Sequence, residues 1–171
     1  CIMKMDAGID TGPVYASREV RIETADNSQT LSEKLAETGG DLLLETLPSI
    51  LDGTAVPEKQ PENGATYASM LKKKDGLLDF TLSADSLFNR IRAFYPWPGA
   101  YMLYCGQPLK IHQASLQSGK TGPAGTRFVH AGCPAVMCAE GALLLEVVQP
   151  AGKKPMNGRV FLNGARNWEG V

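Results

Sequence analysis

The sequence predicts two parts of different fold class: an α/β segment that would finish an open sheet, and then a small all-β barrel with one or two helices. In the first part, a turn rich in Gly and Asp lies between strand-like runs, and leucines then recur at helical spacing over residues 31–51. The second part holds about five short β-prone runs between Gly-rich turns. We therefore expect a first domain at residues 1–53, a linker at 54–74 and a second domain at 75–171.

The first part is expected to contain one more strand and one long helix. Residues 14–22 alternate loosely and are rich in β-formers, which indicates a strand leaving the Gly- and Asp-rich turn. Residues Thr30 and Glu33 form the capping-box pattern, and the leucines that follow predict a helix as far as Gly53. The pair Gly39-Gly40 lies in its middle, where it would kink the helix or allow a close backbone contact.

The linker and the second part follow from changes in this pattern. Residues 54–74 contain two prolines, an Asn-Gly pair and three consecutive lysines, without a sustained apolar period. Ser83 is then the expected N-cap of an amphipathic helix that ends before Pro96. The expected strands cover residues 101–104, 109–117, 126–130, 135–138 and 143–149. Short strands with Gly-rich turns are typical of the oligonucleotide/oligosaccharide-binding (OB) barrel, which a short helix at residues 157–162 would close.

The composition indicates a globular protein without a membrane span. The 171 residues are 43% hydrophobic and 20% charged, and no apolar run approaches the roughly 18 residues that cross a bilayer. The cysteines show neither Cys-x-x-Cys spacing nor a histidine ligand pattern: they are Cys1, Cys105, Cys133 and Cys138. We therefore expect no metal site, and buried free thiols in a reducing cytoplasm.

The net charge of −1 hides an asymmetry between the two parts. Residues 1–75 carry 8 Lys and Arg against 13 Asp and Glu, whereas residues 76–171 carry 9 against 5. A basic second part is consistent with an anionic partner such as a nucleic acid, and a solvated surface is the alternative.

The turn at residues 3–14 holds the residue with the greatest catalytic potential, Asp10. A carboxylate on a rigid loop between strands can relay a proton or orient a histidine when its partners lie within hydrogen-bond reach. The alternative is that Asp6 and Asp10 only stabilise Asx-turns. The spacing alone leaves both interpretations open.

Four stretches of the sequence resemble one enzyme family, the formyltetrahydrofolate-dependent formyltransferases. They are residues 3–14 (MKMDAGIDTGPV), 67–80 (YASMLKKKDGLLDF), 89–100 (NRIRAFYPWPGA) and 161–166 (FLNGAR). The resemblance spans nearly the whole chain and is greatest to the members that act on aminoacylated initiator tRNA. It implies that the first part is the C-terminal tail of an open-sheet formyltransferase domain and that an OB-like domain follows.

The resemblance also implies roles for the residues of the first turn. Asp10 matches the catalytic aspartate of the family, and Met5, Asp6, Ala7 and Gly8 match the turn whose backbone contacts the pterin of the folate. The implied formyl donor is 10-formyltetrahydrofolate, with no metal. The implied acceptor is the α-amine of methionyl initiator tRNA, in a cytoplasmic and monomeric enzyme of translation initiation.

A tRNA acceptor arm would have to pass between the two domains, where cationic side chains are concentrated. The candidate phosphate contacts are Lys72, Lys73, Lys74, Arg90 and Arg92. Trp97 stands in a stiff turn between two prolines, where it could stack on a base. We expect it instead to wedge the preceding helix against the barrel.

Two parts of the family pattern do not occur: an Asn-x-His motif and a Ser-Leu-Leu-Pro loop. The sequence also begins at Cys1, so we expect a piece of a longer enzyme that is inactive alone. His112 and His130 lie in strand-like runs without an asparagine two positions earlier, and are expected to be structural. Alternatives are a formyltransferase acting on a nucleotide-linked amino sugar, the hydrolase part of a formyltetrahydrofolate dehydrogenase, and a non-catalytic RNA- or oligosaccharide-binding module.

Overall fold

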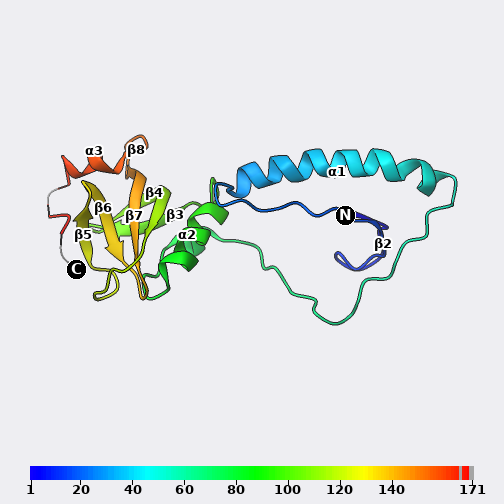
Figure 1. The fold of residues 1–171 in the computed structure, drawn as a ribbon, viewed down its shortest axis with the longest axis horizontal. Helices are drawn as coiled ribbons and strands as arrows, with labels where there is room; N and C mark the ends of the chain where they lie inside the picture. The colour runs from blue at the N-terminus through cyan, green and yellow to red at the C-terminus, as the bar shows by residue number, and fades with distance from the viewer. Residues whose placement is uncertain (166, 170–171) are drawn as a thin grey trace. The chain divides into compact units, whose positions relative to one another are not determined.

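The chain divides into two compact units, residues 1–70 and residues 71–171. The structure is a computed structural model that describes residues 1–165 and 167–169, and Figure 1 shows its elements. The division falls inside the segment 54–74 that the sequence analysis assigns to a linker. Arg166, the last residue of the fourth family-like stretch, lies outside the described residues.

The first unit contains a small hairpin and one long helix. Strands β1 (Ile2–Met3) and β2 (Val14–Ala16) pair antiparallel, and helix α1 (Ser28–Leu51) follows. The expectation of a strand as far as residue 22 is wrong, because β1 offers only two residues with which β2 can pair. Strand-forming side chains do not by themselves hold a strand that has no partner for its backbone.

Helix α1 begins earlier than the sequence pattern predicts. Its N-cap is Asn27, whose Oδ1 accepts hydrogen bonds from the N–H groups of Gln29 at 2.9 Å and Thr30 at 3.0 Å. The hydroxyl of Thr30 accepts one in return from the N–H of Asn27 at 3.0 Å. The predicted cap at Thr30 with Glu33 is therefore wrong: Thr30 is at position N3, the last residue of the box, rather than at the N-cap. Asn at the N-cap satisfies the same free N–H groups.

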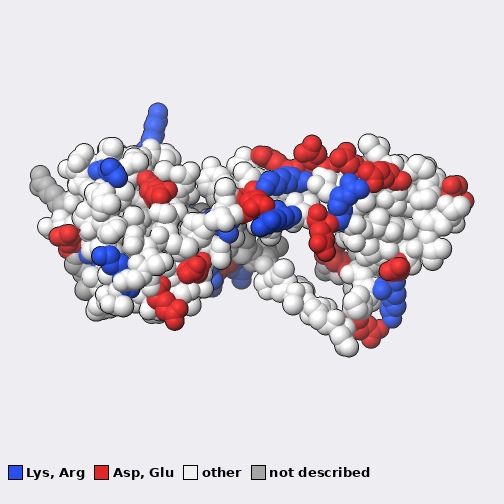
Figure 2. Space-filling model, viewed as in Figure 1, with Lys and Arg blue, Asp and Glu red and all other residues white. Residues whose placement is uncertain are grey.

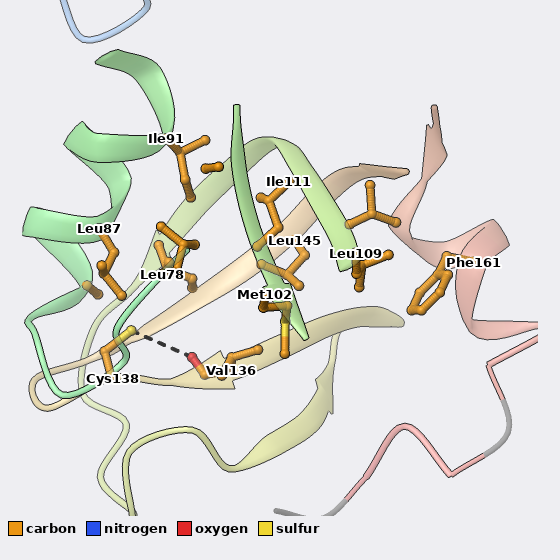
Figure 3. Close-up of a cluster of buried hydrophobic side chains, with 14 of the residues drawn as sticks. Leu78, Leu87, Ile91, Met102, Leu109, Ile111, Val136, Cys138, Leu145 and Phe161 are labelled. Atoms are coloured by element: carbon orange, nitrogen blue, oxygen red, sulfur yellow. Dashed lines mark hydrogen bonds between the residues drawn. The ribbon is translucent and has the colours of Figure 1, made fainter. Parts of the chain in front are cut away.

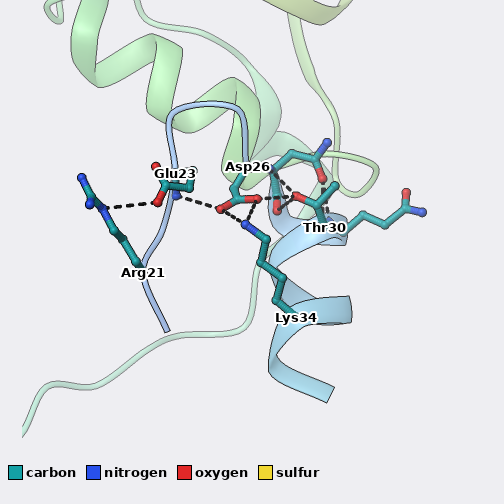
Figure 4. A network of polar contacts seen from close by, with 7 residues as sticks. Arg21, Glu23, Asp26, Thr30 and Lys34 are labelled. Carbon is teal, nitrogen blue, oxygen red and sulfur yellow. Dashed lines mark hydrogen bonds and ion pairs between the residues drawn. The ribbon is translucent and has the colours of Figure 1, made fainter. Parts of the chain in front are cut away.

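A buried carboxylate reinforces this helix start, as Figure 4 shows. Asp26 is 6% exposed and accepts hydrogen bonds from the Nζ of Lys34 and the N–H of Glu23, both at 2.8 Å. The hydroxyl of Thr30 donates a third bond to it at 3.1 Å. These bonds, first of all that from Lys34, lower the pKa of Asp26, because they favour its charged form. The network ties the chain before α1 to the first turns of the helix.

Helix α1 is far more exposed than a helix in the interior of a complete domain. Leu42 is its one buried residue, and a Cβ at Gly39 or Gly40 would meet no atom within 4 Å. The helix continues through this glycine pair, and no described residue packs closely on it. Acidic side chains gather over α1 in Figure 2, and four of them recur at every fourth position: Glu33, Glu37, Asp41 and Glu45.

The second unit is built on one antiparallel sheet. Its strands are β3 (Ala100–Tyr104), β4 (Gln107–Gln117), β5 (Arg127–His130), β6 (Cys133–Met137), β7 (Ala142–Pro150) and β8 (Met156–Asn157). They pair in the order β3-β4-β7-β6-β5, and β8 pairs with β7. The five predicted strands are confirmed within a few residues, and β8 was not predicted. Between the described residues β3 and β5 do not pair, so the sheet is open rather than a closed barrel.

Three short helical segments accompany this sheet. They are the 3₁₀ turn η1 (Lys73–Gly76), α2 (Ala84–Ala93) and α3 (Gly158–Leu162). The predicted N-cap of α2 is confirmed, since the Ser83 hydroxyl accepts from the N–H of Ser86 at 3.2 Å. The helix predicted at the end of the barrel is confirmed as α3, which Asn157 caps.

The core of the second unit lies between the sheet and these helices. Figure 3 shows Leu87 and Ile91 of α2 pointing toward the sheet, with Phe161 of α3 at the other end of the cluster. Leu145 and Ile111 lie on the strands between them. The apolar sheet face is thus covered. The expected class, an α/β tail followed by a β domain with helices, is confirmed, but the predicted OB-like barrel is not closed, because β3 and β5 do not pair among the described residues.

Candidate functional site

The loop that joins β1 to β2 carries the predicted catalytic and folate-binding residues. The N–H of Lys4 donates to the carbonyl of Pro13 at 2.9 Å and closes the base of the loop. Gly12 is buried there, and a Cβ in its place would collide with the Lys4 carbonyl oxygen. The loop is therefore held at its base by backbone contacts that only glycine allows.

Asp6 organises the first half of this loop. Its Oδ1 accepts hydrogen bonds from the Thr11 hydroxyl at 2.6 Å and from the N–H of Gly8 at 3.0 Å. These bonds, that from Thr11 first, lower the pKa of the Asp6 carboxyl. A Cβ at Gly8 would collide with the Thr11 hydroxyl. The Asx-turn interpretation therefore holds for the side chain of Asp6, and the side chain of the predicted pterin-contacting residue is occupied within the loop.

Asp10 has a different environment from Asp6. Its backbone is left-handed, with φ of 55°, and its side chain is exposed. A non-glycine residue in this conformation is uncommon, although Asp is among the residues that tolerate it. The neighbouring residues Met5, Ala7 and Gly8 are exposed as well. The loop thus presents the Asp10 carboxylate and its flanking backbone to the outside of this unit.

Gln60 fixes the Asp10 loop from a distant point in the sequence. Its Nε2 lies 2.9 Å from the carbonyl oxygen of Asp10 and 2.7 Å from that of Gly12. Two residues away in each segment, Val14 and Glu58 exchange two backbone hydrogen bonds of 2.8 Å each. This segment was expected to be a linker, and Gln60 was not among the predicted site residues. No sequence signal could have identified it, because an amide side chain between two prolines does not indicate which distant backbone groups it contacts.

The predicted lysine cluster lies on the surface of the second unit. Lys72, Lys73 and Lys74 are exposed at the start of η1. The N–H of Lys72 donates to the carboxylate of Asp75 at 2.7 Å, which caps this turn. Among the described residues none of the three ammonium groups is in an ion pair. Their charges are therefore available to an anionic ligand.

Arg90 and Arg92 are more deeply engaged than the lysines. The guanidinium of Arg90 lies 5.6 Å from the ring centre of Phe94, and that of Arg92 lies 5.0 Å from the ring centre of Phe88. Arg92 also donates to the Asn89 side chain at 2.7 Å. Both arginines are half-buried, so they contribute to packing on α2 in addition to any contact with phosphate.

The expected role of Trp97 as a wedge is wrong. Its side chain is 58% exposed, whereas Leu87, Ile91 and Phe94 fasten α2 to the sheet. The reason is the turn that follows the helix: it buries Phe94 and directs the tryptophan away from the core. An indole could therefore meet a ligand at this position.

Two of the remaining chemistry-bearing side chains, His112 and Cys138, have structural surroundings. The Nε2 of His112 lies 2.9 Å from the Gln149 side chain on the next strand, which supports the expected structural role. All four cysteines are free, as expected, but only Cys138 is buried, where desolvation raises its thiol pKa to about 11. In the described ranges no cluster of His, Cys, Asp and Glu could hold a metal, and no helix is long and apolar enough to cross a membrane.

Comparison with protein families identifies the class to which these features belong. The description "Formyl transferase, C-terminal domain" matches residues 70–166, and the chain belongs to this family. A curated relative, methionyl-tRNA formyltransferase of Myxococcus xanthus (strain DK1622), is 41% identical over 163 residues, which cover 95% of this chain and 52% of the relative. The chain thus spans about half the length of that relative.

Two solved structures share this fold. Methionyl-tRNA formyltransferase from Clostridium thermocellum aligns with a TM-score of 0.52 and 24% identity, over 69% of this chain and 50% of that one. HypX from Aquifex aeolicus, in complex with tetrahydrofolic acid, aligns with a TM-score of 0.67 and 16% identity, over 99% of this chain and 32% of that one. At these identities the likeness concerns the fold alone. The predicted family is confirmed by the family match and the curated relative.

Proposed function

We propose that this chain supplies part of an enzyme that transfers a formyl group from 10-formyltetrahydrofolate to the α-amine of methionyl initiator tRNA, for translation initiation in the cytoplasm. The observation that carries the proposal is the 41% identity to a methionyl-tRNA formyltransferase over 95% of the chain. The shared stretch includes both the Asp10 loop and the lysine cluster. A solved sugar 3N-formyl transferase, WlaRD, shares the fold with a TM-score of 0.64 but only 17% identity, so the amino-sugar alternative is supported by the fold alone.

Asp10 is the proposed catalytic carboxylate. Its exposed side chain stands on a loop whose backbone is fixed by Gln60 and by the contact between Gly12 and Lys4. A carboxylate held in this way can orient a neighbouring base or exchange a proton with it. In the longer enzyme we assign that base to a histidine outside these residues, so the chain alone is expected to be inactive.

The exposed backbone of this loop is suited to hold a folate ligand. Residues Met5, Ala7 and Gly8 are exposed, and the Asp6 side chain turns inward to Thr11 and keeps the backbone of the turn in one shape. These four residues would hold the pterin through their backbone groups. The bound folate supplies the formyl group, and this chain supplies the ordered surface and the Asp10 carboxylate.

The second unit is the proposed tRNA-binding part, in a monomeric enzyme. The lysines at 72, 73 and 74 are exposed and free of ion pairs in the described chain, and Arg90 and Arg92 add charge on the neighbouring helix. Phosphate contacts of this kind give affinity with a steep dependence on salt.

A chimaera tests the proposal directly. The matching part of the Myxococcus xanthus relative is replaced by this chain, and formyl transfer to initiator methionyl-tRNA is measured with 10-formyltetrahydrofolate as donor. We expect activity, and a loss of about 100-fold or more in kcat for Asp10→Asn, the range for a lost proton-transfer group. Asp41→Asn, on the exposed acidic face of α1, is the matched control and should leave the rate unchanged.

Two results would contradict the proposal. A folded chimaera that formylates a nucleotide-linked amino sugar but not methionyl-tRNA would move the function to another acceptor. Turnover by the purified 171-residue chain alone would show that a histidine outside these residues is unnecessary and that Asp10 does not act through it.

A further inference from the structure

The turn after α2 places one large aromatic side chain in solvent. The N–H of Gly99 donates to the carbonyl of Phe94 at 2.9 Å, which closes the turn, and Phe94 is buried beneath it. Gly99 has φ of 79°, a conformation that a side chain would strain. Trp97 stands between these two fixed points and remains 58% exposed. This large aromatic side chain therefore gains little stabilisation from burial, although it stands on an ordered turn.

The lysine cluster is fastened to this same turn. A Cβ at Gly76 would collide with the carbonyl of Gly99, so the two backbones lie in direct contact. The N–H of Leu78 donates to the carbonyl of Tyr101 at 2.9 Å and continues the attachment. Lys74 and Trp97 each stand two residues before one of the two touching glycines. Two residues of chain reach about 7 Å, so Lys74 and Trp97 both lie within about 7 Å of chain from the point where the two backbones touch.

The chemistry of this area favours a nucleic acid. Bases stack on exposed aromatic rings whatever their identity, and lysines alongside bind the phosphates that join them. The nearby carboxylates are occupied: Asp75 accepts from the N–H of Lys72, and Asp79 accepts from the hydroxyl and N–H of Thr81. A purely apolar protein partner would leave three ammonium groups beside its interface without counter-charges.

We infer that Trp97 is the stacking platform of a single-stranded nucleic-acid site, in which Lys72, Lys73 and Lys74 bind the phosphates on either side of the stacked base. The inference rests on the proposed function for the choice of ligand, the unpaired 3′ end of initiator tRNA. It adds a base-contacting residue to a surface otherwise defined by charge.

Tryptophan fluorescence of the full chain provides the test. The chain has two tryptophans, and Trp168 is 3% exposed, so a neutral quencher such as acrylamide reaches mainly Trp97. An RNA oligonucleotide with the sequence of the 3′ end of initiator tRNA should quench the Trp97 emission saturably and protect it from acrylamide. Deacylated initiator tRNA should do the same, and the same tRNA without its unpaired 3′ nucleotides should not.

Two variants separate stacking from charge. Trp97→Ala should weaken oligonucleotide binding about tenfold at every salt concentration and leave the salt slope unchanged, because it removes no charge. Replacing the three lysines by glutamine should instead reduce the slope of log K against log salt by about 2. Trp97→Phe keeps an aromatic face and should retain most of the affinity. The melting temperature of each variant reports whether it folds.

The outcomes distinguish this inference from the proposed function. If initiator tRNA binds, but the Trp97 emission is unchanged and Trp97→Ala binds equally well, the stacking site is wrong and the tRNA function stands. If single-stranded oligonucleotides quench Trp97 but intact initiator tRNA neither quenches it nor binds, the stacking site stands and the tRNA function loses its support. If no nucleic acid binds even at low salt, both are wrong.

Discussion

Different interactions stabilise the interior of each of the two units. Among the residues that the structure describes, 19 apolar residues are buried: 18 lie in the second unit, and Leu42 lies in the first, where every residue is described. The first unit depends on polar contacts instead: the network around Asp26, the loop bonds to Asp6 and the amide of Gln60. The net contribution of one hydrogen bond to the free energy of unfolding is about 1 kcal/mol, whereas that of a buried leucine is about 2 kcal/mol or more.

The comparison also separates two kinds of surface. The α1 helix of the first unit leaves Leu43, Leu44, Leu47 and Leu51 exposed, a face that a domain core normally covers. In the second unit the helix α2 buries Leu87 and Ile91 and leaves polar residues outside. The first unit therefore carries the proposed catalytic loop without a hydrophobic core of its own, whereas the second unit has a core that stabilises its fold.

The largest expected effect comes from separating the units. Residues 71–171 expressed alone should unfold in one cooperative transition in urea, because nearly all of the buried apolar surface is theirs. Residues 1–70 alone should show no cooperative transition, since one helix and a two-strand hairpin bury too little surface to offset chain entropy. Circular dichroism of the two pieces checks this. A sharp transition in the 1–70 piece would contradict the comparison.

Single leucines should reproduce the same contrast inside the intact chain. Leu143→Ala, at a fully buried position of β7, should lower the free energy of unfolding by about 2–5 kcal/mol. Leu44→Ala, at a 72% exposed position of α1, should change it by less than about 0.5 kcal/mol. Urea denaturation of both variants measures the two values. Equal losses would indicate that the face of α1 is covered in solution, for example by a second copy.

Removal of the amide that fixes the candidate catalytic loop should have a smaller, local effect. Gln60→Ala removes two hydrogen bonds to the carbonyls of Asp10 and Gly12, and amide exchange at Lys4 should accelerate about tenfold. Glu62→Ala, an exposed residue of the same segment paired only with Lys59, is the control. Hydrogen exchange followed by NMR measures both. An unchanged exchange rate at Lys4 in the Gln60→Ala variant would show that Gln60 does not stabilise the loop.

The smallest expected effect is the pH dependence of the start of α1. The pKa of Asp26 lies below its ordinary value of 3.8 because the folded state binds its charged form, mainly through Lys34. The stabilisation is therefore complete above about pH 5 and is lost as pH falls through the lowered pKa. The protection of the N–H groups of Gln29 and Thr30, measured relative to their intrinsic exchange rates, should decrease below about pH 4. The Asp26→Asn variant should lack this step, and equal protection at pH 6 and pH 2 in the parent chain would contradict the prediction.

Most of the second unit could be predicted from the sequence, because its signals are local. Gly-rich turns delimit the strands, Ser83 caps α2, and the apolar period of α2 names its buried face. The family match was predicted from short stretches of sequence as well. Strand β8 was missed because two residues carry no periodicity.

Other features depend on partners far along the chain. Trp97 between two prolines is equally compatible with burial and exposure until the position of Phe94 is known, and Gln60 gives no sign that it reaches back to Asp10. The strand expected to reach residue 22 ends at Ala16 because its partner ends.

Local patterns in the sequence predicted the class of each part, most elements of the second unit and the position of the candidate catalytic loop. Those features follow from residue spacing and turn chemistry, which act over a few residues. Only the tertiary structure decided which charged and aromatic side chains remain exposed, and which distant residue holds the Asp10 loop in its shape. Burial and long-range hydrogen bonds depend on what the fold brings together, and no short window of sequence contains both partners.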